Sequence, residues 1–172
     1  MRIRRKIMLL GDIDVGKTSI IDRLVFGKFD IGSKVTINVD MFRYAIDDAG
    51  PAGDQSVDWV IWDTDGKMAD SVFKNQYYIA GAAAALIVGD ITRRQTMDTM
   101  VRLASLCATK LPGRYVAFIL NKIDLIEPGV DVDLPPGLAT TQNTVMRTSA
   151  KTGENVRDAF KDAATAVLRR GH

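Results

Sequence analysis

The stretch "GDIDVGKT", Gly11 to Thr18, decides the fold class of this chain. It follows the short apolar run "KIMLL" and leads into a segment in which Ile20, Ile21, Leu24 and Val25 recur at helical spacing. The pattern G-x-x-x-x-G-K-[ST] between a strand and a helix is typical of a loop that wraps a polyphosphate with backbone N–H groups, with the helix dipole adding to the attraction. The alternative, a plain glycine turn, is disfavoured because strand, loop and helix all agree with the motif.

Apolar runs that alternate with segments of helical period predict the rest of the fold. "YVAFIL" and "AAALIVGD" are continuously apolar, as expected of strands covered on both faces, and "VDWVIWD" is a further strand. The segments Met97 to Ala108 and Val156 to Val167 each place apolar side chains on one helical face. Residues 47–56 are typical of a hairpin tip. We therefore predict one α/β domain over residues 1–172, with about six mainly parallel strands, one antiparallel hairpin strand and helices on both faces.

The composition excludes several classes of protein. A formal net charge of +2 is too weak to indicate a nucleic-acid partner. No run approaches the ~18 apolar residues of a membrane span, so we expect a cytoplasmic protein without a transmembrane segment. Cys107, the single cysteine, lies in a helical segment and is expected to be a small core residue and not a nucleophile.

The phosphate loop assigns the first ligand contacts. Lys17 is expected to reach the β- and γ-phosphates, and the Thr18 hydroxyl is expected to bind Mg²⁺. The motif by itself does not separate ATP from GTP. The predicted contacts of the loop and of the start of the helix come from Gly11, Asp14, Val15, Gly16, Lys17, Thr18 and Ser19.

Two further motifs indicate guanine. "NKID", Asn121 to Asp124, ends the "YVAFIL" strand, and "TSAK" precedes the last helix, so both belong at the carboxyl edge of the sheet. A carboxylate only accepts hydrogen bonds, so Asp124 matches the two donors of guanine and disfavours adenine, and with it a P-loop kinase or ATPase. The other predicted base contacts are Asn121, which bridges base and phosphate loop, Lys122, whose stem covers the base, Ser149, Ala150, whose N–H meets the guanine oxygen, and Lys151.

With these motifs in order, the chain resembles the Ras superfamily of small GTPases, and most of all its Rab branch. The shared motifs are "GDIDVGKT", "VTINVD", "WDTDG", "NKID" and "TSAK". The resemblance implies a small P-loop G domain that binds GTP or GDP with Mg²⁺ and acts as a molecular switch. It also implies that Thr36 binds Mg²⁺ and senses the γ-phosphate, that Asp63 holds the metal through water, that the Gly66 N–H touches the γ-phosphate and that Phe29 lies against the guanine.

The resemblance further implies protein partners. Effectors would read the two loops ordered by the γ-phosphate, switch I around Thr36 and switch II after Asp63, and an exchange factor and an activating protein would act on the nucleotide. The candidate reading residues are apolar groups near an exposed rim; the alternative is that they pack the sheet. They are Ile37, Met41, Trp62 and Tyr77. Met41 replaces the phenylalanine usual in Rab proteins.

The residue after "DTDG" departs from the family. There the family places a glutamine that orients the attacking water, whereas this chain has Lys67, a donor without an acceptor. Ile13 adds bulk at the loop position nearest the γ-phosphate. We expect Lys17, Thr36, Gly66 and Lys67 to surround the reacting phosphate and GTP hydrolysis to be intrinsically slow. The alternatives are a pseudo-GTPase scaffold with negligible turnover, and a Lys67 that points to solvent and pairs with Asp65.

The ends of the chain leave two alternatives open. The sequence stops without the C-terminal cysteine of prenylated relatives, which indicates either trimming or an unlipidated, prokaryotic type of member. Arginines near both termini form either a basic patch for peripheral membrane contact or merely solvated ends. They are Arg2, Arg4, Arg5, Arg169 and Arg170. A monomer or weak dimer is expected.

Overall fold

A six-stranded sheet forms the centre of the molecule in the computed structural model, which describes residues 2–32, 39–139 and 145–171. The strand order is β2-β3-β1-β4-β5-β6; β2 and β3 are antiparallel and the other four pairings are parallel. This confirms the predicted fold class. The strands are β1 (Arg2–Gly11), β2 (Val39–Ala49), β3 (Gln55–Thr64), β4 (Ala82–Asp90), β5 (Tyr115–Asn121) and β6 (Val145–Arg147).

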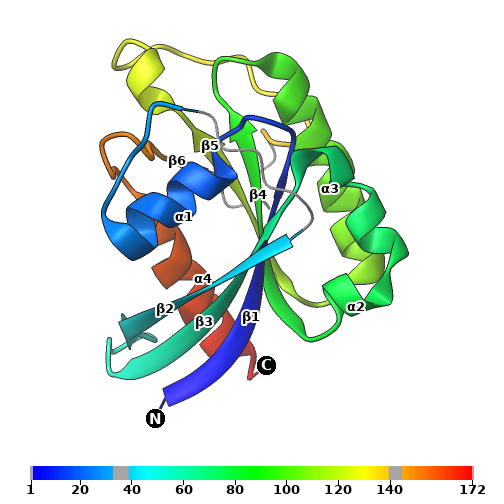
Figure 1. Cartoon of the computed structure of the whole chain (residues 1–172), viewed down its shortest axis with the longest axis vertical. Helices are drawn as coiled ribbons and strands as arrows, with labels where there is room; N and C mark the ends of the chain where they lie inside the picture. The colour runs from blue at the N-terminus through cyan, green and yellow to red at the C-terminus, as the bar shows by residue number, and fades with distance from the viewer. Residues whose placement is uncertain (1, 33–38, 140–144, 172) are drawn as a thin grey trace.

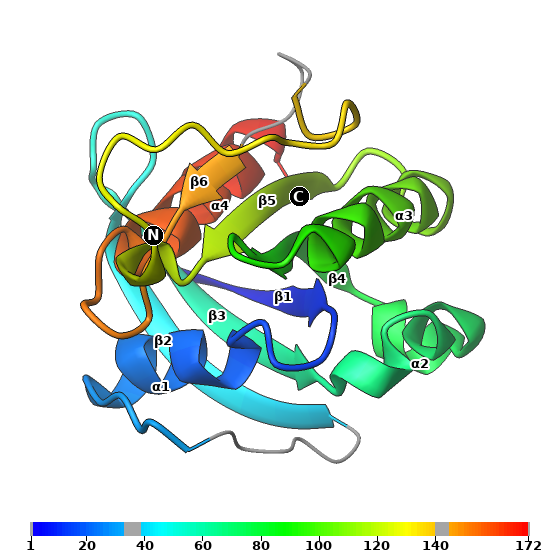
Figure 2. The same ribbon diagram turned by 90° about the horizontal axis from the view of Figure 1, so that it is seen from above.

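Helices cover both faces of the sheet, as Figure 2 shows from above. Helices α1 and α4 pack on one face, while α3 and the short α2 lie over the other. The helices are α1 (Lys17–Phe26), α2 (Gln76–Ile79), α3 (Arg94–Lys110) and α4 (Val156–Arg170), with 3₁₀ turns η1 (Gly66–Met68), η2 (Ser71–Lys74) and η3 (Ile123–Leu125).

The alternation of side chains along β1 explains why the sheet needs a layer on each side. Ile7 and Leu9 pack in the core under α1 and α4, whereas Met8 and Leu10 pack in the core under α3. Because successive side chains of a strand point to opposite faces, an unbroken apolar run is stable only when both faces are covered. The run "IMLL" therefore corresponds to the centre of the fold and not to a membrane segment.

The predicted apolar face of α3 is right except at its end. Met97, Met100 and Cys107 are buried, but Ala108 is exposed and Leu103 takes a fully buried position. At 100° per residue, position 108 has turned away from the stripe formed by 100, 103 and 107. Burial raises the pKa of the Cys107 thiol to about 12, which agrees with a core residue and not with a nucleophile.

The parallel strands bring their carboxyl ends to one edge of the sheet, where the loops after β1, β3, β4 and β5 meet (Figure 1). Both termini lie at the opposite end of the molecule in that view. The hairpin tip is confirmed, since β2 ends at Ala49 and β3 begins at Gln55. Within the described residues, none of the helices is both long enough and apolar enough to cross a bilayer.

Candidate nucleotide-binding site

The phosphate loop joins β1 to α1 as the motif predicts. Its glycine at position 16 caps the helix with φ 97°, a left-handed conformation that disfavours any side chain. A Cβ on Gly16 would also collide with the side-chain nitrogen of Asn121. The loop therefore approaches the end of β5 so closely that only glycine fits, which brings the phosphate and base motifs together.

Lys17 lies under this loop with only 6% of its surface exposed. Its ammonium donates to the backbone carbonyls of Gly11, at 3.0 Å, and Asp12, at 2.8 Å. Burial lowers the pKa of Lys17 to about 8, although the nearby carboxylates, chiefly that of Asp63, act in the opposite direction. The loop thus holds a preformed cation at its centre.

Two side chains with oxygen atoms suited to a metal ion lie beside this lysine. The Thr18 hydroxyl, at the start of α1, donates a hydrogen bond of 2.5 Å to Asp63 Oδ2, near the end of β3. Asp63 is fully buried. A hydroxyl and a carboxylate are hard oxygen ligands of the kind that Mg²⁺ prefers, so this donor set fits the predicted metal. Thr36, the third predicted metal residue, and Ile37 lie outside the described residues.

The turn after β3 lies against the phosphate loop. A Cβ on Gly66 would come within 2.5 Å of the Ile13 Cα and backbone nitrogen, so a side chain there would push the two segments apart. The Asp65 carboxylate caps the following 3₁₀ turn by accepting the Lys67 backbone N–H at 2.9 Å. Among the described residues the contact of Lys67 with Asp65 is therefore made by the main chain, and the alternative of an ion pair between their side chains is not seen.

The Lys67 side chain itself is exposed, and no ion pair of its ammonium is found among the described residues. Ile13 is also 45% exposed at the outer side of the loop. Neither residue offers a hydrogen-bond acceptor on its side chain. Ile13 and Lys67 thus expose an alkyl group and a cation close to the contact of Gly66 with the phosphate loop.

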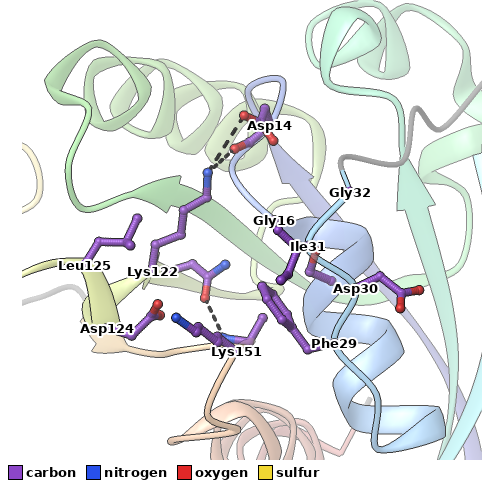
Figure 3. Close-up of a pocket in the computed structure, with 13 residues that line it drawn as sticks. Asp14, Gly16, Phe29, Asp30, Ile31, Gly32, Lys122, Asp124, Leu125 and Lys151 are labelled. Atoms are coloured by element: carbon purple, nitrogen blue, oxygen red, sulfur yellow. Dashed lines mark hydrogen bonds and ion pairs between the residues drawn. The ribbon is translucent and has the colours of Figure 1, made fainter.

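A cavity of about 470 Å³ opens beside the phosphate loop (Figure 3). Phe29 borders it from the segment after α1, and Asp124 and Lys151 border it on the other side. Phe29 is half-buried and packs against the core under α1 and α4. The Phe29 ring and the stem of Lys122, which also lines the cavity, offer two apolar surfaces between which a planar base can stack.

Asn121 links the phosphate loop to the base-side loops. Only 1% of the surface of Asn121 is exposed, and its Nδ2 donates to the Val15 carbonyl at 3.0 Å. Its Oδ1 accepts from Thr148 Oγ1 and from the Ala150 N–H, both at 3.1 Å. The bridging role predicted for Asn121 therefore has a geometric basis. The Ala150 N–H, predicted to meet the guanine oxygen, here donates to Asn121.

Asp124 is exposed at the rim of the cavity and is held by a hydrogen bond from Ser149. Ser149 Oγ donates to Asp124 Oδ1 at 2.6 Å, and the same hydroxyl accepts the Thr152 N–H at 3.0 Å. The contact gives Ser149, which the motif placed among the base contacts, the role of orienting the carboxylate. An oriented, acceptor-only group at the cavity rim suits a base edge with two donors.

Lys122 spans from the base side back to the phosphate loop, in a left-handed backbone conformation with φ 69°. Its ammonium donates to the Asp14 carbonyl at 2.6 Å and pairs with Asp90 Oδ2 at 2.9 Å. The Asp14 carboxylate is 3.9 Å away and largely exposed, as expected for an acid beside an anion site. The stem of Lys122 lines the cavity.

Sequence reasoning missed three residues that support the site. Asp90 pairs with Lys122, and Arg93 donates to the Ile13 carbonyl of the phosphate loop. Arg23 Nε, on α1, donates to the Ala150 carbonyl at 2.8 Å. One signal was available for Asp90, because a carboxylate directly after an otherwise apolar buried strand needs partners. Nothing in the local sequence distinguishes Arg93 from its neighbour Arg94.

The predicted reading residues differ in exposure. Met41 and Tyr77 are 65% and 77% exposed, so these two do not pack the sheet. Trp62 is half-buried, with Lys6 Nζ 3.4 Å from its ring centroid and Tyr78 packed edge-on at 6.4 Å. Met41 is thus an exposed apolar group opposite a supported aromatic ring in the β2–β3 pairing, and Tyr77 is exposed on the residue before the ring's partner Tyr78.

Some of the arginines near the two termini make ion pairs or ring contacts within the domain. Arg2 pairs with Asp47 at 2.9 Å and Asp58 at 3.0 Å. Arg170 lies over the ring of Tyr115 at 5.7 Å. These contacts favour the interpretation of the termini as ordinary solvated ends held to the domain surface.

A mainly parallel sheet with a strand–phosphate loop–helix unit and base motifs at its carboxyl edge defines a P-loop GTP-binding protein. Comparison with protein families matches residues 6–169 to the Ras family. The chain belongs to the Ras family, whose members are GTPases that act as molecular switches.

Rab-related proteins are among its relatives. The chain is 34% identical over 167 residues to "Ras-related protein YPT3" of Nicotiana plumbaginifolia, which covers 95% of this chain and 74% of the relative. It is 34% identical over 169 residues to "Ras-related protein Rab5A" of Oryza sativa subsp. japonica, covering 95% and 79%. It is 32% identical over 170 residues to "Ras-related protein RABF2a" of Arabidopsis thaliana, covering 97% and 82%. The Rab-like resemblance is thereby confirmed.

Proposed function

We propose that residues 1–172 form one G domain that binds GTP and GDP with Mg²⁺ and hydrolyses GTP slowly because Lys67 stands in place of a water-orienting glutamine. The observation that carries the nucleotide assignment is the cavity between the phosphate loop and Asp124. Asn121 connects its two sides, because it donates to Val15 of the phosphate loop and accepts from Ala150 of the base-side loop. The two ends of the cavity match the two ends of a guanine nucleotide.

Base selection would rest on Asp124. Its carboxylate accepts both donors of the guanine edge, whereas adenine presents a ring acceptor there and would be repelled. Ser149 donates to one carboxylate oxygen and so fixes the orientation of the group. Phe29 and the Lys122 stem would stack on the two faces of the base.

Phosphate binding would rest on the loop and its buried lysine. Lys17 already donates to two loop carbonyls, so little reorganisation is needed before it reaches the β- and γ-phosphates. Thr18 and Asp63, with Thr36 by the family resemblance, would hold Mg²⁺. The metal, when bound, supplies charge neutralisation to the phosphate oxygens.

The slow hydrolysis follows from what borders the γ-phosphate side. An amide side chain can accept a hydrogen bond from water while donating to phosphate, but an ammonium cannot accept at all. The exposed Lys67 could approach the phosphate and stabilise its charge, yet the attacking water would stay unoriented. Ile13 would add bulk on the same side. An activating protein would have to supply the missing acceptor.

Single-turnover hydrolysis of bound GTP tests this proposal. We expect the wild type to hydrolyse slowly and Lys67→Gln to be about tenfold faster, since it regains an oriented water. Lys67→Met is the matched control, because it removes the charge without adding an acceptor and should not gain. A wild-type rate equal to that of ordinary relatives, with no gain in Lys67→Gln, would contradict the proposal.

A nucleotide-holding scaffold with negligible turnover is the second candidate, and the same lysine favours it. The nucleotide extracted from purified protein separates the two. GDP indicates turnover, and GTP indicates the scaffold. An adenine nucleotide would instead contradict the guanine assignment and revive the P-loop kinase or ATPase.

The partner surface is proposed at the exposed apolar residues beside the turn after β3. Met41 and Tyr77 are exposed, and Met41 lies opposite Trp62 in the β2–β3 pairing, which suits an effector that recognises an apolar rim. Met41→Ala and Tyr77→Ala should weaken capture of a GTP-dependent partner while leaving nucleotide affinity unchanged. Loss of nucleotide affinity in both variants would show that the residues serve the fold instead.

A further inference from the structure

Arg93 contacts the phosphate loop from outside the nucleotide cavity. It is the residue directly before α3, and its Nη2 donates to the Ile13 carbonyl at 2.8 Å across 80 positions of sequence. Its Nε donates to Asp90 Oδ2 at 3.1 Å. The side chain is 32% exposed, so the contact is partly protected from water. The planar guanidinium can serve both acceptors at once, which a lysine ammonium does less well.

Asp90 holds this arginine in place from the end of β4. Its side chain is 3% exposed; Oδ1 accepts the Thr92 N–H and hydroxyl at 2.9 and 2.6 Å, while Oδ2 accepts Arg93 and Lys122. Burial alone would raise the pKa of Asp90, but hydrogen bonds from Thr92 and Lys122 outweigh it and keep the pKa below its ordinary value. A buried carboxylate thus fixes two cations.

Both cations donate to consecutive carbonyls of the phosphate loop. Arg93 binds the carbonyl of Ile13, and Lys122 binds that of Asp14 at 2.6 Å. In a trans peptide the C=O of one residue and the N–H of the next point in opposite directions. Holding these two carbonyls therefore directs the N–H groups of Asp14 and Val15 away from the two cations, an arrangement that suits a phosphate cradle.

We propose that Arg93 is a positioning residue that preorganises the phosphate loop for nucleotide and thereby slows nucleotide release. The proposal rests on the proposed guanine-nucleotide function and adds to it a residue outside the recognised motifs. Lys122 contributes to the same arrangement but also lines the base cavity. Arg93 has no part in the cavity lining, so its substitution isolates the effect on the loop.

Release of a fluorescent GDP analogue from Arg93→Ala tests this proposal. Losing a charged hydrogen bond to the loop should raise the release rate about tenfold. Arg93→Lys, which keeps the charge but reaches only one acceptor well, should give an intermediate rate. Arg94→Ala is the matched control, because its neighbouring guanidinium pairs with Asp98 and Asp133 and does not touch the loop. Its release rate should equal that of the wild type.

Two further measurements separate positioning from other roles. Hydrolysis of prebound GTP in a single turnover should change by less than about twofold in Arg93→Ala, since a residue on the outer carbonyl does not touch the reacting phosphate. Asp90→Asn should also speed release, and adding it to Arg93→Ala should produce less than the product of the two effects. Thermal midpoints of all variants show whether each is folded.

Three outcomes would overturn the proposal: release from Arg93→Ala as slow as from the wild type, release from Arg94→Ala as fast as from Arg93→Ala, or a tenfold loss of hydrolysis with unchanged release. The first two would mean that the contact does not order the loop, and the third that the arginine acts on the reacting phosphate. A wild type that binds no guanine nucleotide would instead contradict the proposed function itself.

Discussion

The two ends of the nucleotide cavity differ in how strongly their residues are held. At the base end, Asn121 accepts hydrogen bonds from Thr148 and the Ala150 N–H, and Ser149 donates to Asp124. Arg23 donates to the Ala150 carbonyl from α1. At the end that we assign to the γ-phosphate, the side chains of Ile13 and Lys67 are exposed. Apart from Arg23, the residues of the first end belong to the motifs "NKID" and "TSAK", while Lys67 at the second is the position at which the sequence is expected to depart from the family.

Under the proposed function, this difference means that base recognition and the orientation of the attacking water depend on different residues. Recognition needs hydrogen-bond acceptors and donors that are oriented before the ligand binds. The loops after β5 and β6, which are joined by hydrogen bonds, supply them. In the proposed function, hydrolysis needs one additional acceptor for water, and Lys67 supplies only donors at that position. Substitutions at the two ends should therefore have separable effects.

The largest effect is expected at the base end. Asp124→Ala removes two charge-assisted hydrogen bonds to guanine and should weaken GTP affinity about 100-fold while abolishing the preference for GTP over ATP. Isothermal titration calorimetry with both nucleotides measures this. An unchanged preference would break the assignment of that end. Leu125→Ala, on the next residue of the same cavity wall, should retain the preference.

Metal removal should affect the phosphate end next most strongly. Chelating Mg²⁺ should speed GDP release about 30-fold, because the phosphate charge then lacks a counter-ion. Thr18→Ala should already release quickly and respond less to the chelator. Stopped-flow release with and without chelator measures both rates. If chelation does not alter release from the wild type, Thr18 and Asp63 do not hold a metal at this end.

Ile13→Gly sharpens the comparison on the hydrolysis side. The substitution removes bulk near the γ-phosphate and should raise single-turnover hydrolysis by about threefold, and by more when combined with Lys67→Gln, since water and its acceptor then both fit. The affinity for GDP should stay nearly constant. A large loss of GDP affinity would show that the two ends are not separable.

The smallest effect is a spectroscopic one outside the cavity. Burial lowers the pKa of Lys6 to about 8, so its charge over Trp62 should be lost as the pH rises through this value. Tryptophan fluorescence should change with a midpoint near pH 8 in the wild type. Lys6→Met is the control, and a transition that persists in it would assign the change to another group.

The same lysine determines the sign of a pH effect on stability. Its pKa is about 8 in the folded protein and 10.5 in the unfolded chain, so between these values the unfolded chain binds more protons. Stability from this group therefore rises with pH over that window, and the full cost of burying the charge is present below it. Urea unfolding of wild type and Lys6→Met at pH 7 and pH 10 checks the sign.

The sequence predicted the sheet, the phosphate loop and the base motifs because each depends on local pattern. The apolar run of β1 is continuous in the sequence because both faces of the strand are covered. Asn121 belongs to a recognisable tetrapeptide at the end of a strand. The prediction of Ala108 as a buried residue failed because a one-residue phase error in a helix turns a side chain through 100°.

The contacts of Arg93, Lys6 and Arg23 could not be predicted in the same way. Lys6 lies over Trp62 only because β1 and β3 pair in a register that aligns Met8 with Trp62. Arg93 reaches Ile13 only after β4 has been placed beside β1. These contacts depend on register and strand order, which a single sequence does not reveal.

The buried amide of Asn121 has a consequence for folding. It joins residues 106, 29 and 27 positions apart, so the cavity can exist only once distant parts of the chain have assembled. A partly folded chain would then have no measurable hold on nucleotide, and free ligand would favour the assembled state by mass action. Each tenfold rise in nucleotide above its dissociation constant would add about 1.4 kcal/mol to the free energy of unfolding. Heat resistance of the protein should consequently follow the nucleotide supply.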